Sequence, residues 1–251
     1  MSLLEVRKVG RRYSGVRAVH DVSFNVDAGE WVGVIGPNGA GKSTLFNTLG
    51  GQVTASSGKV IYDGRDITTM APHRRYAAGI SRSFQISSLF PELTVREHLA
   101  LATRHHHRWN LVRGWASDRT VRARIEAVVE HWDLTEVARG PHGGMRPDDM
   151  SYGEQRRLEL AIAVCSRPRL LLLDEPNVGL TVDECDDLRA RLLELGESTA
   201  VIFVAHDMDM IMGWSHRILV MHQGELVADD EPEAIMTNPF VEEVYLGVAQ
   251  S

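Results

Sequence analysis

One short segment limits the fold of this chain more than any other. Residues 36–43 read Gly-Pro-Asn-Gly-Ala-Gly-Lys-Ser, which matches the pattern G-x-x-x-x-G-K-[S/T] of a loop that cradles nucleotide phosphates. The apolar run 31–35 precedes the loop, and the helix-like stretch 42–50 follows it. Strand, glycine-rich loop and helix in this order predict an α/β fold of the P-loop NTPase type.

The loop has the chemistry that a triphosphate needs. Glycines let the backbone turn tightly so that several N–H groups point at one anion, and the following helix adds its positive N-terminal end. Lys42 can reach the outer phosphates, and the Ser43 hydroxyl can ligate Mg²⁺. The residues that we expect to wrap the phosphates are Gly36, Pro37, Asn38, Gly39, Ala40, Gly41, Lys42, Ser43 and Thr44.

A second motif follows the apolar run 170–173, where Asp174 and Glu175 stand at the end of the expected strand. Ionised carboxylates at the end of a buried strand cost energy unless they meet a cation. We expect Asp174 to hold Mg²⁺ through water and Glu175 to orient or activate the attacking water. A surface turn that carries two acids is the alternative, and the upstream phosphate loop argues against it.

The rest of the chain alternates strand-like and helix-like patterns. Alternation of apolar and polar residues predicts half-buried strands at 3–9 and 22–27, and turn residues predict hairpins at 58–67 and 217–228. A further buried strand is expected at 200–205. Helical patterns occur at 94–103, 119–132, 153–166 and 183–196, and two short helical pieces at 232–247.

Composition argues against several classes of protein. The 251 residues are 43% hydrophobic, enough for one large domain or one core with a smaller lobe, and the net charge of −7 argues against a nucleic-acid partner. The two cysteines are expected to be reduced thiols, with Cys165 buried. We expect no signal peptide, and no apolar run approaches the roughly 18 residues of a membrane-spanning helix.

The segment 150–157, Met-Ser-Tyr-Gly-Glu-Gln-Arg-Arg, indicates which family of nucleotide-binding proteins the chain is similar to. It resembles the signature sequence of ABC ATPases in a divergent form, and the resemblance covers nearly the whole chain. It implies a mostly parallel central sheet flanked by helices, an antiparallel β-subdomain and a helical lobe with the signature. The implied single domain has its core at 1–85 and 167–251 and the helical subdomain at 86–166.

The resemblance also implies roles for individual residues. Tyr13 would stack on adenine, Gln85 would link the metal to the membrane partner, and His206 would sense the γ-phosphate. Ser151, Gly153 and Glu154 would face the ATP of the opposite subunit; the first two also fit a helix cap and turn. The implied cofactors are ATP and Mg²⁺, the catalytic residues are Lys42, Glu175 and His206, and the metal residues are Ser43, Gln85 and Asp174.

The family implies an ATP-hydrolysing subunit of a membrane transporter. The signature, the segment 79–99 and the tail 238–247 resemble ATPases of branched-chain amino-acid importers and of their urea or amide relatives. Lipopolysaccharide-export ATPases and a soluble ABC ATPase outside transport are the alternatives. A soluble ABC ATPase of this kind usually needs a coiled-coil insertion. No sustained heptads lie between Ser43 and Asp174, which argues against this alternative.

The implied partners are permease subunits, a second ABC ATPase in a homodimer or heterodimer, and an extracytoplasmic solute-binding protein. The implied location is the cytoplasmic face of the cell membrane, where residues near 86–99 would meet the permease. The loop 178–181, which would cross to the other subunit, departs from the family at Val178 and at Thr181-Val182. We interpret His105-His106-His107 as a solvated loop, since three adjacent residues cannot converge on one ion from a helix.

Overall fold

The computed structural model describes residues 2–83, 89–103, 118–140, 143–196 and 198–243. The chain divides into two compact units. Unit 1 comprises Met1–Ile80, Arg169–Pro176 and Gly196–Ser251, and unit 2 comprises Ser81–Pro168 and Asn177–Leu195. The domain boundaries expected from the sequence, with a helical subdomain at 86–166, stay a prediction.

A six-stranded sheet in the order β10-β9-β3-β8-β7-β6 forms the centre of the fold. Strand β3 runs parallel to β8 and β9, β7 runs parallel to β8, and β10 is antiparallel to β9. All residues of β3, β7 and β8 are buried, as the apolar runs predicted. The strands are β3 (Trp31–Ile35), β6 (Ile80–Arg82), β7 (Leu170–Asp174), β8 (Ala200–Val204), β9 (Arg217–His222) and β10 (Glu225–Asp230).

A second, antiparallel sheet in unit 1 has the order β2-β1-β4-β5. The predicted hairpins form, each around two residues with positive φ: Asp63 and Gly64 between β4 and β5, and Gln223 and Gly224 between β9 and β10. Such turns match the twist of the strands that they join. The strands are β1 (Ser2–Tyr13), β2 (Val16–Asp27), β4 (Ser57–Tyr62) and β5 (Arg65–Asp66).

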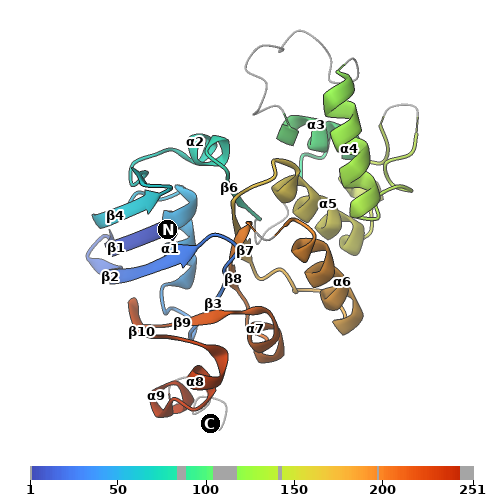
Figure 1. The fold of residues 1–251 in the computed structure, drawn as a ribbon. Coiled ribbons are helices and arrows are strands. Elements are labelled where there is room, and N and C mark those ends of the chain that lie inside the picture. The colour runs from blue at the N-terminus through green and yellow to red at the C-terminus, as the bar shows by residue number, and fades with distance from the viewer. Residues whose placement is uncertain (1, 84–88, 104–117, 141–142, 197, 244–251) are drawn as a thin grey trace. The chain divides into compact units, whose positions relative to one another are not determined.

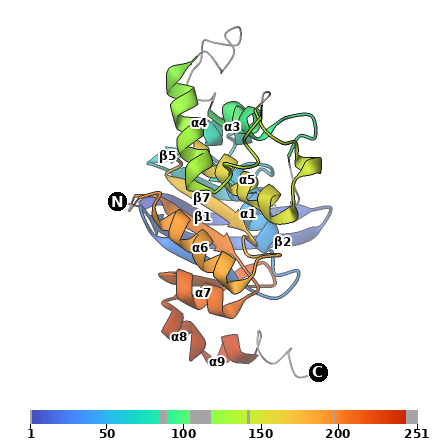
Figure 2. The ribbon, with the colours of Figure 1, turned by 90° about the vertical axis from the view of Figure 1, so that its right-hand side faces the viewer.

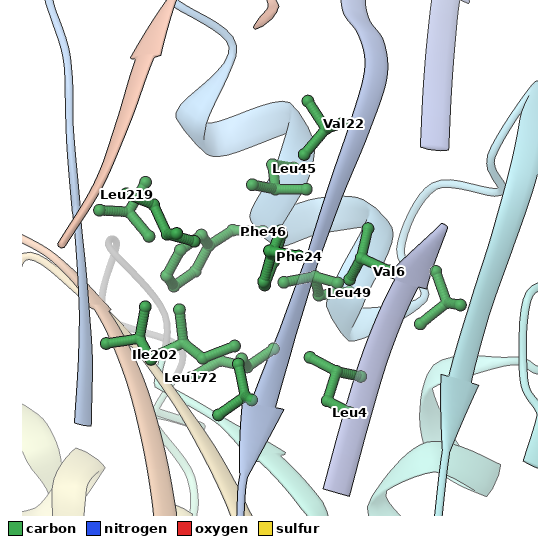
Figure 3. Packing of buried hydrophobic residues seen from close by; sticks show 14 of the residues in the cluster. Leu4, Val6, Val22, Phe24, Leu45, Phe46, Leu49, Leu172, Ile202 and Leu219 are labelled. Atoms are coloured by element: carbon green, nitrogen blue, oxygen red, sulfur yellow. The ribbon is translucent and has the colours of Figure 1, made fainter. Parts of the chain in front are cut away.

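The helix α1 (Lys42–Gly50) carries the phosphate loop at its start and packs into the core of unit 1. In Figure 3 its apolar side chains lie between residues of the antiparallel sheet and residues of the six-stranded sheet. Burying one such side chain stabilises the fold by about 1.5–3 kcal/mol. The residues are Leu45, Phe46 and Leu49 from α1, Val6, Val22 and Phe24 from one sheet, and Leu172, Ile202 and Leu219 from the other.

Unit 1 contains two short helices that the sequence analysis missed, α2 (Pro72–Ala77) and α7 (Met208–Trp214). Both are too short to show a helical period, and the available signals were local. Proline stands at the start of α2, and the Asp207 side chain accepts a hydrogen bond from Met210 N at the start of α7. The tail pieces form as predicted, as α8 (Pro232–Met236) and α9 (Pro239–Val241).

Unit 2 is helical (Figure 1). Helices α3 (Val95–Thr103) and α4 (Arg119–His131) pack beside α5 (Tyr152–Cys165), as Figure 2 shows. A short 3-10 turn at Pro147–Asp149 precedes α5, and α6 (Val182–Leu193) is the fourth helix described in this unit. The four predicted helices are confirmed with small shifts at their ends. Within the described part of the chain, no helix combines the length and the apolar character needed to cross a membrane.

Candidate functional site

The phosphate loop connects the end of β3 to the start of α1. Gly41 has a φ of 100°, and a Cβ placed there would lie 2.4 Å from Ala18 O, so only glycine fits. Gly41 also has no side chain to cap α1. A helix of this length without such a cap presents its first N–H groups and its dipole to an anion.

Lys42 is held inside the loop. Its Nζ donates hydrogen bonds to the carbonyl oxygens of Gly36 at 2.5 Å and Pro37 at 3.1 Å, and the residue is 8% exposed. Burial lowers the pKa of Lys42, while the carboxylates of Glu175 and Asp174 act in the opposite direction. The loop and the second motif, which are far apart in the sequence, therefore affect the same ammonium group.

The phosphate loop, the pair Asp174 and Glu175, and His206 lie at the same edge of the sheet because the strands that precede them are parallel neighbours. Asp174 is the last residue of β7 and pairs in register with Val204, the last residue of β8. Strand β3, which precedes the loop, lies on the other side of β8. In open α/β sheets the ligand site lies at the carboxyl ends of the strands.

Asp174 and Glu175 occupy different environments at this edge. Asp174 is 3% exposed, whereas Glu175 reaches the side chain of His206, whose Nε2 lies 3.2 Å from Glu175 Oε1. Glu175 has a φ of 49°, and its N–H donates to Val204 O at 2.9 Å. A non-glycine residue in this region costs about 1–3 kcal/mol and is held in place only where the surrounding structure requires it.

Tyr13 ends β1 and is 39% exposed. The guanidinium carbon of Arg11 lies 4.6 Å from the centroid of its ring, so a cation already covers part of the aromatic surface. Arg11 was not among the residues predicted from the sequence. Its position two residues before Tyr13 was the available signal, because residues i and i+2 of a strand lie on the same face.

Ser151, Gly153 and Glu154 lie in unit 2, at the start of α5. The Ser151 side chain accepts a hydrogen bond from Glu154 N, and the Glu154 carboxylate accepts hydrogen bonds from Ser151 N at 2.7 Å and from Ser151 Oγ at 2.7 Å. These hydrogen bonds lower the pKa of Glu154, and the bond from the Ser151 hydroxyl has the larger effect. Ser151 is thus the helix cap that the sequence predicted. The contacts of all three residues with nucleotide stay a prediction.

The donor set fits a Mg²⁺ ion that arrives with a nucleotide. Among the residues that the structure describes, no three His, Cys, Asp or Glu side chains gather to hold a metal alone. Mg²⁺ typically uses one or two carboxylates together with substrate phosphates. Ser43 and Asp174 supply such oxygen atoms. The third expected metal residue, Gln85, lies outside the described residues, as does the segment 105–107.

Comparison with known protein families matches residues 19–178 to the family described as ABC transporter. The high-affinity branched-chain amino acid transport ATP-binding protein BraF of Pseudomonas aeruginosa is 38% identical and aligns over 98% of both chains. The corresponding protein LivG of Escherichia coli K12 is 35% identical, also over 98% of both chains.

Solved structures show the same fold. The ADP conformation of an ATP-binding cassette of an ABC transporter has a TM-score of 0.82 and 25% identity, over 98% of this chain and 99% of that one. A dimeric structure of a bacterial ABC transporter cassette has a TM-score of 0.77 and 25% identity, over 91% of this chain and 98% of the other.

Proposed function

This chain belongs to the ABC transporter family, and we propose that it is the ATP-binding subunit of an importer for branched-chain amino acids. It is an ATPase whose hydrolysis of ATP is coupled to transport. One observation carries the choice of site: Lys42 lies inside the phosphate loop and is within electrostatic reach of both Asp174 and Glu175. Branched-chain amino acids are proposed because BraF and LivG, which align over nearly the whole chain, serve their transport.

In the proposed reaction, Tyr13 stacks on the base and residues 36–44 surround the phosphates. Lys42 neutralises charge on the transferred phosphoryl group, which is the main task in this chemistry. Glu175 orients the attacking water, and the neighbouring His206 contacts the γ-phosphate. The 3.2 Å approach of His206 to Glu175 supports this division of roles, since it places the two side chains together at the same edge of the sheet.

Ser43 and Asp174 would hold Mg²⁺, together with Gln85. When bound, the ion neutralises phosphate charge that the single lysine of the phosphate loop leaves unbalanced. The burial of Asp174 supports this assignment, because an ionised carboxylate at 3% exposure is stabilised by a nearby cation.

The assembly that we propose contains two ATPase subunits, permease subunits and a solute-binding protein, with this chain at the cytoplasmic face of the membrane. The signature residues Ser151, Gly153 and Glu154 of one subunit would cover the ATP of the other. The dimeric cassette among the similar structures supports the pairing.

The first test uses Glu175→Gln, which keeps the shape of the side chain and removes its charge. We expect ATP and Mg²⁺ to bind, hydrolysis to stop and a closed dimer to accumulate in gel filtration. Glu233→Gln, an exposed glutamate in α8, is the control and should behave as the parent. A Glu175→Gln variant that hydrolyses ATP at the parental rate would refute the role of Glu175.

The second test concerns the transported solute. Vesicles that contain the chain with its permease should take up labelled leucine in an ATP-dependent manner, and Lys42→Ala should abolish the uptake. Uptake of urea in place of leucine would reject the proposed substrate and leave the ATPase assignment intact.

A further inference from the structure

Helices α5 and α6 of unit 2 both begin with a capping box. Ser151 and Glu154 form a capping box at the start of α5, and Thr181 and Glu184 form a second one at the start of α6. In the second box the Glu184 carboxylate accepts hydrogen bonds from Thr181 N at 2.8 Å and from Thr181 Oγ1 at 3.0 Å. The departure from the family pattern at Thr181 therefore supplies a helix cap.

The first residue of α5, Tyr152, lies against the loop 177–181. A Cβ added to Gly179 would lie 2.5 Å from Tyr152 Cε1, closer than any real side chain allows. Gly179 also has a φ of 79°, a conformation that favours glycine. The Tyr152 hydroxyl donates to Val178 O at 3.5 Å. The tyrosine ring thus occupies the space that the missing side chain of Gly179 leaves.

The two helix starts are also linked by charge. A Cβ on Gly153 would lie 4.0 Å from Glu184 Oε1, so the carboxylate of one box lies beside the backbone of the other. Hydrogen bonds within each box are the main cause of the lowered pKa of Glu154 and Glu184, and the charge of Arg157 is a further cause for both.

We propose that Tyr152 is a positioning residue that ties the loop 177–181 to the signature helix α5 of the same chain. The loop begins two residues after Glu175 in the sequence, so a loop held against α5 limits where the backbone beyond Glu175 can go. The proposal rests on the proposed function, because it assigns Tyr152 a part in the turnover of ATP. It does not make Tyr152 a contact of the nucleotide.

Burial alone does not account for Tyr152. The residue is 57% exposed, and a substitution at such a position usually changes stability little. Its contacts go to Gly179 and to Val178, one of the loop positions at which the chain departs from the family pattern. A structural role would affect unfolding, whereas a positioning role affects turnover.

The experiment compares Tyr152→Ala with Tyr152→Phe in the assembled ATPase. We expect Tyr152→Ala to lower kcat about tenfold, as small misplacements of a reacting group do, and to change KM for ATP by less than about twofold. Tyr152→Phe keeps the ring over Gly179 and should retain most of the turnover. Leu193→Ala, at an apolar residue of α6 that is 53% exposed, is the matched control.

A double variant tests the contact itself. Gly179→Ala places a methyl group where the ring lies, so it should lower kcat by itself, and adding Tyr152→Ala should cause little further loss because the ring is already displaced. Independent, multiplying losses of kcat would overturn the proposal. So would a parental kcat for Tyr152→Ala, or a loss confined to thermal stability. If the parental chain neither binds nor hydrolyses ATP, the proposed function itself fails.

Discussion

We expect Arg75→Met to lower the free energy of unfolding of the chain by about 3–5 kcal/mol, a large effect for one residue. Arg75 lies in α2, is 1% exposed and has its guanidinium surrounded by backbone carbonyl oxygens. Burial lowers its pKa to about 10, so the group stays charged at neutral pH. It donates to Met70 O at 2.9 Å, Thr48 O at 2.7 Å, Leu49 O at 2.6 Å, Ile67 O at 2.7 Å and Thr68 O at 3.1 Å.

The magnitude follows from the acceptors. Leu49 belongs to the last turn of α1, where carbonyl groups lack a partner within the helix. Thr48 O and Ile67 O each also accept from a backbone N–H, that of Gly51 at 3.3 Å and that of Met70 at 2.9 Å, so these two carbonyls keep one partner without Arg75. A buried carbonyl left without a partner costs about 1–3 kcal/mol. The costs of the individual carbonyl groups do not add fully in the variant, because some of them gain water and because the cost of burying the charge of Arg75 is removed. The net loss in the free energy of unfolding is therefore the value stated above.

Urea unfolding followed by circular dichroism measures the effect, with the neighbouring exposed Arg74→Ala as control. Arg74→Ala should change the unfolding free energy by less than about 0.5 kcal/mol. Arg75→Lys retains the charge but has three donors on one atom, so we expect an intermediate loss. If Arg75→Met is as stable as Arg74→Ala, the reasoning from unpaired carbonyls is wrong.

Two further predictions concern unit 2. Burial lowers the pKa of His98, against the opposing effects of its hydrogen bond to Thr94 O and of Glu97. The folded state therefore keeps the imidazole neutral, while the unfolded chain takes up a proton near the ordinary pKa of 6.5. The contribution of neutral His98 to the free energy of unfolding should be complete above about pH 6.5 and should decrease as the pH falls below that value. The free energy of unfolding of His98→Gln should depend less steeply on pH in this range. Burial also raises the pKa of the Cys165 thiol to about 11, so in the native protein a thiol reagent should modify Cys185 alone. Cys185→Ser should then show no native labelling, and rapid labelling of that variant would contradict the burial of Cys165.

Most of the helices and strands, and their order along the chain, follow from local patterns in the sequence. Runs such as 31–35 and 170–173 are short and apolar throughout, which is typical of a strand buried on both faces. Turn residues between two strand-like segments located the hairpins. The motif at 36–43 identified the loop because its spacing is a local property of the chain. Short helices such as α2 were missed because their few residues show no period.

Packing between elements controls which distant groups meet. Strand order brings Asp174 and Glu175 to the ammonium of Lys42, and no local pattern in the sequence specifies which parallel strands become neighbours. The positive φ of Glu175, the hydrogen bonds of Arg75 to Thr48 and Leu49 and the ring of Tyr152 over Gly179 depend on contacts between segments far apart in the chain. Residue spacing records periodicity along one element, whereas these features arise from packing between elements.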